Sequence, residues 1–100
     1  MSGNWTGTNS TLGTFTMNLT QTATFITGTY TDADVARFGT GRTDPAQPGI
    51  IRPDASFEIR MKQGPFTDFT FRGSMDNTGR RLTGGIFGSG FTGQPFAMTK

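Results

Sequence analysis

The sequence predicts an all-β protein, specifically an eight-stranded antiparallel up-and-down β-barrel, and three observations carry this prediction. Glycine is frequent, at 15 of 100 residues, and about a fifth of the residues are threonine, which favours strands together with the aromatic residues. Short segments in which apolar and polar side chains alternate recur along the chain. At several places a glycine stands two positions after a large apolar residue, a pattern that is typical of a tightly coiled sheet. A two-sheet β-sandwich is the alternative architecture.

The clearest of these segments is residues 24–31, which we expect to organise the fold. Side chains two positions apart in a strand share a face, so Ile26, Gly28 and Tyr30 point the same way. A glycine between two large side chains leaves room for a facing ring and lets the sheet coil. Residues 1–100 are therefore interpreted as one domain with a modest core.

Eight such segments in series, joined by short connections, predict a meander of antiparallel strands. The predicted strands are residues 3–8, 13–20, 24–31, 36–43, 56–62, 68–75, 81–88 and 94–100. Segment 36–43 is the least defined, because its pattern does not show which face is buried. Residues 76–79 form a strong hairpin signal between the sixth and seventh strands.

Three strand pairings can be predicted from how their side chains match. In the second and third strands, Leu19 would face Ile26, Met17 would face Gly28 and Phe15 would face Tyr30. In this register each bulky side chain meets a bulky or empty partner on one face.

The fifth and sixth strands are better specified, because both of their faces agree on one register. Met61 with Phe69, Ile59 with Phe71 and Phe57 with Gly73 would then pair on the inner face. On the outer face the same register pairs Lys62 with Asp68 and Glu58 with Arg72, which are opposite charges both times. After the hairpin turn, Leu82 would face Gly73 and Gly84 would face Phe71.

Residues 44–55 hold Pro45, Pro48 and Pro53, and prolines at this density interrupt ladder pairing. We therefore expect a long loop here, and long loops in compact domains often bind ligands. Ile50 and Ile51 lie within it, so the loop is expected to fold back onto the mouth of the barrel.

The side chains predicted to point inward are apolar or aromatic, and none of them is charged. They are Trp5, Phe15, Met17, Leu19, Ile26, Tyr30, Phe57, Ile59, Met61, Phe69, Phe71, Leu82, Ile86, Phe96 and Met98. Four further phenylalanines fall on the outer face or in loops, which suggests a partner surface. These are Phe25, Phe66, Phe87 and Phe91.

The composition argues against several classes of function. The chain has no histidine and no cysteine, so we expect no enzyme activity, no cofactor and no metal site. The net charge is +2 and most arginines are spread singly, so no nucleic-acid partner is expected. No apolar run approaches the roughly 20 residues of a membrane helix, so no membrane span is expected. The absence of cysteine leaves the compartment open, and a periplasmic or secreted bacterial protein is favoured.

The first third of the chain resembles the start of avidin and streptavidin chains. The resemblance rests on Gly3–Trp5, Gly13–Phe15 and the strand Ile26–Tyr30. It implies an eight-stranded barrel, usually oligomeric, that holds biotin at one end, and the architecture is also similar to lipocalins and other calycins. By position, Tyr30 would match the tyrosine that contacts the biotin ureido oxygen.

Other positions depart from that family. Asp32 stands where a ligand-binding serine or threonine is usual, and Gly7 stands where the family has its ureido-binding asparagine. Trp5 is the only tryptophan, whereas the family surrounds biotin with several. The resemblance therefore supports the architecture and argues against tight biotin binding.

Two functions follow as hypotheses. The first is binding of a small apolar or aromatic ligand at the barrel mouth, with a polar side chain as its handle. Its predicted contact residues are Trp5, Tyr30, Asp32, Ile50, Ile51 and Phe71. The second is a protein-interaction or self-assembling module, with a homo-oligomer as its assembled form, whose lumen is filled by side chains and holds no ligand.

Overall fold

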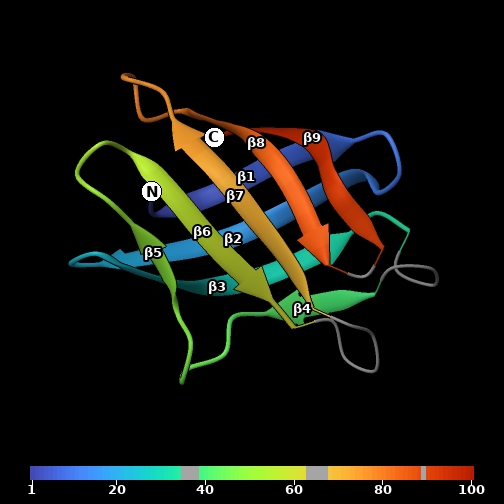
Figure 1. Ribbon diagram of the computed structural model, residues 1–100, viewed down its shortest axis with the longest axis horizontal. Helices are drawn as coiled ribbons and strands as arrows, with labels where there is room; N and C mark the ends of the chain where they lie inside the picture. Colours follow the sequence, from blue (N-terminus) through green and yellow to red (C-terminus); the bar gives the residue numbers. More distant parts are fainter. Residues whose placement is uncertain (35–38, 63–67, 89) are drawn as a thin grey trace.

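The computed structural model describes residues 1–34, 39–62, 68–88 and 90–100, and it shows a closed, all-β antiparallel barrel (Figure 1). Nine strands are present in these residues. They are β1 (Gly3–Asn9), β2 (Gly13–Thr22), β3 (Phe25–Asp32), β4 (Thr40–Arg42), β5 (Gly49–Ile51), β6 (Ser56–Met61), β7 (Phe69–Met75), β8 (Arg81–Gly88) and β9 (Phe91–Thr99). The predicted fold class is therefore confirmed, and the sandwich alternative is wrong.

From β1 to β4 and from β5 to β9, each strand pairs with the next one in the chain, and β9 returns to pair with β1, which closes the wall. The short strands β4 and β5 both pair with β3, and they occupy one position in the wall between β3 and β6. Nine strands thus make a barrel of eight positions, and a barrel of this size is just wide enough for side chains to fill.

The alternation of faces follows the sequence closely. Every side chain predicted to point inward is buried, and Leu12 and Ile51 join them in the core. This agreement arises because the period of two in a strand assigns faces locally, without knowledge of the partner strand.

The register between β6 and β7 is the predicted one. Phe57 faces Gly73 and Ile59 faces Phe71, while the Glu58 carboxylate lies 3.5 Å from the Arg72 guanidinium on the outer face. Lys62 differs from its prediction, because its ammonium forms an ion pair with Asp44 instead of Asp68.

The predicted register between β2 and β3 is wrong by two residues. Met17 faces Tyr30 and Phe15 faces Asp32, because a turn of only two residues joins the strands. The turn holds Ala23 at a positive φ of 55°, and it is shorter than the connection over residues 21–23 that the predicted strands leave. A shift of two residues leaves every side chain on its face, so the core is unaffected.

The register between β7 and β8 is also shifted by two. Gly73 faces Gly84, and Leu82 faces Met75 rather than Gly73, while Phe71 faces Ile86. β7 ends and β8 begins at the predicted residues, Met75 and Arg81, so only the pairing across the hairpin differs from the prediction.

The proline-rich segment is not simply a loop, and this corrects the prediction for residues 44–55. Strand β5 lies inside it, with Ile51 buried and Ile50 exposed on the opposite face. Of the predicted strand 36–43, residues 36–38 lie outside the described part, and β4 covers Thr40–Arg42 of the remainder. Between β4 and β5 the Thr43 side chain provides a hydrogen bond to β3, because its hydroxyl accepts from the Gly28 N–H at 3.1 Å.

Glycine makes room inside the barrel where the sequence suggested it would. Gly7 on β1 lies opposite Phe15 on β2, and a Cβ at Gly7 would stand 2.6 Å from the Phe15 ring. It would also meet the Met98 side chain at 2.5 Å. The Phe15 ring therefore occupies space that any other residue at position 7 would need.

Candidate functional site

The interior of the barrel is spanned by aromatic rings. Phe15 on β2 and Phe71 on β7 come from opposite sides of the eight-position wall, and their ring centroids are 5.7 Å apart. Tyr30 lies 5.3 Å from Phe15 and 6.1 Å from Phe71, and Phe96 lies 5.3 Å from Phe71. Separations in this range are those of packed aromatic pairs, so at this level the lumen is a core.

Two of the predicted ligand-contact residues, Tyr30 and Phe71, belong to this cluster and have no exposed surface. Trp5 is also fully buried, and Met17 separates it from Tyr30 across the sheet. The indole N–H of Trp5 donates a hydrogen bond to the Met1 carbonyl at 2.7 Å, so its polar atom is already satisfied.

Asp32 lies beside Tyr30 at the end of β3, and both residues are fully buried. The Tyr30 hydroxyl donates to one carboxylate oxygen of Asp32 at 2.6 Å, and the Asp34 N–H donates to the other at 2.8 Å. Burial, and secondarily the hydrogen bond to Asp32, raise the pKa of Tyr30 well above its ordinary value. This pair is the principal polar feature of the interior.

The Tyr30–Asp32 pair lies at one end of the barrel, where β7 and β9 begin. The Tyr30 ring meets Phe69 edge-on at 6.3 Å, and Phe69 in turn meets the half-buried Phe91 at 5.3 Å. The structure thus brings Tyr30, Asp32 and Phe71 together. Ile50 and Ile51 do not join this cluster, and their side chains lie on opposite faces of β5.

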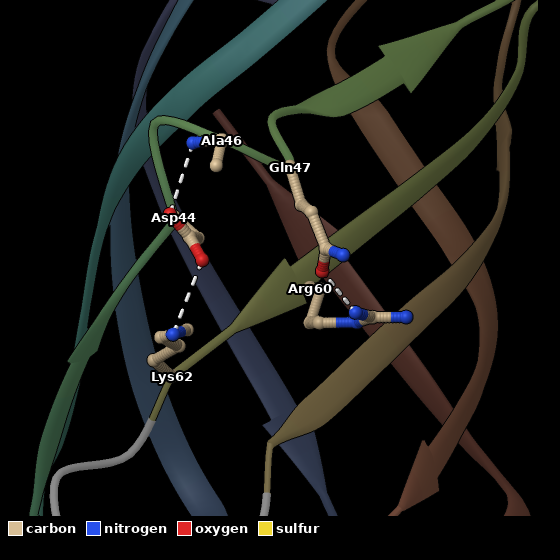
Figure 2. Close-up of polar contacts among 5 residues, drawn as sticks. All are labelled: Asp44, Ala46, Gln47, Arg60 and Lys62. Atoms are coloured by element: carbon tan, nitrogen blue, oxygen red, sulfur yellow. Dashed lines mark hydrogen bonds and ion pairs between the residues drawn. The ribbon is translucent and has the colours of Figure 1, made fainter.

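A second candidate site lies on the outside of the barrel, on the outer face of β3, β4, β5 and β6, which we call the interrupted wall. The turn between β4 and β5 docks there onto β6 (Figure 2). The Asp44 carboxylate accepts a hydrogen bond from the Ala46 N–H at 2.9 Å and lies 3.1 Å from the Lys62 ammonium. Arg60 donates to the Gln47 side chain in the same turn.

In this turn both a backbone N–H and a side chain stabilise the charged form of Asp44. The hydrogen bond from the Ala46 N–H, and then the contact with Lys62, hold the pKa of Asp44 below its usual value. Asp44 is therefore ionised and paired at neutral pH. The sequence alone did not predict this arrangement, although the outward alternation of Glu58, Arg60 and Lys62 was a signal for it.

The interrupted wall also carries exposed apolar side chains. Phe25 is 53% exposed and Ile50 is 38% exposed, and they are direct cross-strand partners on β3 and β5. They are the two exposed large hydrophobic residues of the described chain. Of the other aromatics predicted to lie outside, Phe87 lies under Arg72 at 5.3 Å, Phe91 packs against the core, and Phe66 lies outside the described residues.

The outer face of β1 and β2 differs in kind. Its side chains are threonine and asparagine, and no charged residue lies among them. Thr6 faces Thr16, which faces Thr31, in one row across three strands. The barrel therefore has a neutral hydroxyl-rich side and a side that combines charge with exposed apolar surface.

In the part of the chain that the structure describes, no three acidic, histidine or cysteine side chains gather into a metal-binding group. No helix in those residues is long and apolar enough to cross a membrane. Comparison with protein-family models, with curated proteins and with solved structures gives no match. The closed antiparallel barrel is consistent with a calycin-like fold.

Proposed function

We propose that this chain is a non-catalytic interaction module that binds a second copy of itself through the interrupted wall. The observation that carries the proposal is the pairing of Phe25 with Ile50, which exposes two large apolar side chains side by side on one face. Elsewhere the described large hydrophobic residues are buried or half-buried. Adjacent exposed apolar side chains rimmed by polar residues are typical of a protein contact.

The charges on the same wall support a partner of the same kind. A self-complementary face needs both signs of charge, because residue i of one copy meets residue j of the other. The interrupted wall has Arg42, Arg60 and Lys62 together with Asp44 and Glu58. Arginine and aromatic residues are also the types enriched in the centres of protein interfaces.

The packed interior supports the choice of the outer wall over the lumen. A ligand at the level of Phe15 and Phe71 would have to displace rings whose centroids are 5.7 Å apart. Displacing packed aromatic side chains costs several kcal/mol, which a small ligand would have to offset.

Sedimentation equilibrium of the full chain tests the proposal. We expect reversible self-association, and we expect the double variant Phe25→Thr, Ile50→Thr to weaken it at least about tenfold, which corresponds to about 1.4 kcal/mol. The matched control is Thr6→Ser, Thr16→Ser, which changes a cross-strand pair on the neutral side. A wild-type chain that stays monomeric near 1 mM, or a double variant that associates like the wild type, would overturn the proposal.

A second candidate is the binding of a small apolar or aromatic ligand at the end of the barrel that holds Tyr30 and Asp32. The observation that favours it is the buried hydrogen bond between these residues, close to Phe69 and Phe91. The resemblance to avidin also assigns the position of Tyr30 to ligand contact. Native mass spectrometry of the purified chain tests this: a retained small molecule that Tyr30→Phe releases supports it, and the bare polypeptide mass contradicts it.

A further inference from the structure

Two cations lie directly opposite each other on the interrupted wall, and this arrangement is unusual for a sheet. Arg42 at the end of β4 and Lys62 after β6 exchange both backbone hydrogen bonds, at 3.1 and 2.8 Å. Residues paired in this way have Cα atoms about 5.5 Å apart and direct their side chains to the same face. Like charges in this position destabilise a sheet unless something compensates for them.

Asp44 compensates only part of this charge. Its carboxylate lies 3.1 Å from the Lys62 ammonium, whereas Arg42 forms no ion pair with any residue in the described ranges. Two cations and one carboxylate leave a net charge of one positive unit at this point on the wall. Arg42 is exposed, so its guanidinium is accessible to a ligand.

The same residues line a groove with a volume of about 650 Å³. The groove is formed by residues 29–31 of β3, residues 40–42 of β4, and Lys62. Thr29 lies opposite Arg42 and Thr31 lies opposite Thr40, so exposed threonines from two strands stand beside the cations. A fork of guanidinium donors, an ammonium and neighbouring hydroxyls are the groups that bind tetrahedral oxyanions in proteins.

We propose that this groove binds a tetrahedral oxyanion, the phosphate or sulfate group of a small ligand. The guanidinium of Arg42 donates two hydrogen bonds to it, Lys62 supplies a second positive charge, and the Thr29 hydroxyl donates from the β3 side. The bound anion neutralises the opposed cation pair, which explains how the wall tolerates it. The proposal does not depend on self-association, because the groove is formed within one chain.

The test is an NMR titration of backbone amide shifts with inorganic phosphate and, separately, inorganic sulfate, at constant ionic strength maintained with chloride. The chain should carry Phe25→Thr and Ile50→Thr, so that the result is independent of any contact between copies. We expect saturable shifts at residues 29–31 and 40–42, with a dissociation constant in roughly the millimolar range for an exposed site. Saturation by only one of the two anions assigns the group to that class, and saturation by neither overturns the proposal.

Variants that change the charge of the groove should change the affinity for the anion in opposite directions. Arg42→Gln should weaken binding at least about fivefold, and Arg42→Lys should recover part of the loss because it keeps the charge without the fork. Asp44→Asn should tighten binding at least about threefold, because it removes the competing carboxylate while keeping an acceptor for the Ala46 N–H. Arg81→Gln is the matched control, since Arg81 is an exposed arginine on β8. Equal weakening by Arg42→Gln and Arg81→Gln, or no tightening by Asp44→Asn, would contradict a site at this groove.

Discussion

Gly73 and Gly84 face each other across β7 and β8, and neither position has room for a Cβ atom. A Cβ at Gly73 would lie 1.8 Å from the Thr83 carbonyl oxygen, and one at Gly84 would lie 1.9 Å from the Arg72 carbonyl oxygen. The obstacles are backbone atoms, which cannot rotate away as a side chain can. The close approach of these two strands therefore requires glycine on both sides.

Gly84→Ala should destabilise the chain by about 2–3 kcal/mol, because overlap with the backbone forces the two strands apart. Thr83→Ala, at the exposed neighbouring position, is the control and should cost less than about 1 kcal/mol. Denaturant unfolding followed by the fluorescence of Trp5 measures both. Equal midpoints for the two variants would show that the strands can separate without cost.

Phe71→Ala should destabilise the chain by about 3–5 kcal/mol, since Phe71 is fully buried among Phe15, Tyr30 and Phe96. Phe87→Ala is the matched control, because Phe87 is only half-buried on the outer face beneath Arg72. It should cost clearly less. Thermal unfolding compares the two, and a shift of a degree or less for Phe71→Ala would place that ring outside the core.

Tyr30 should make the stability of the fold fall at high pH. Its pKa is raised in the folded chain, so the unfolded chain loses the phenolic proton first, near pH 10. The contribution of Tyr30 is therefore fully present below about pH 10 and is lost as the pH rises above it. Tyr30 is the only tyrosine, so tyrosinate absorbance reports on it alone.

On raising the pH we expect tyrosinate absorbance to appear only as the chain unfolds, and Tyr30→Phe to lose less stability than the wild type above pH 10. Reversible ionisation near pH 10 in a chain that stays folded would contradict the buried hydrogen bond between Tyr30 and Asp32.

The sequence predicted which residues point inward because that property is local to each strand. It predicted register only where the outer face was informative. Between β6 and β7 the opposite charges of Glu58 and Arg72 distinguish one register from the next. Between β2 and β3 the outer face is mostly threonine, so a shift of two residues changes no charge pairing and keeps both faces intact.

The candidate sites were harder to predict for a different reason. The sequence places Tyr30, Asp32 and Phe71 on an inner face or near a strand end. Whether the space around them can hold a ligand depends on how side chains from opposite strands pack across the barrel, which no single strand specifies. The groove at Arg42 depends on β4 and β5 sharing one position in the wall. The prolines at 45 and 48 favoured a loop there, so the sequence did not predict that β5 continues the wall. Asp44 and Lys62 are far apart in sequence and meet only because of it.

The most direct test of the central claim is an amide NMR concentration series of the wild-type chain, because it reports which surface takes part in self-association. We predict concentration-dependent shifts centred on Phe25, Thr27 and Ile50 of the interrupted wall, with Thr6 and Thr16 on the neutral side unchanged. Shifts centred on Thr6 and Thr16, or no shifts over the whole series, would contradict the claim that the barrel binds through this wall.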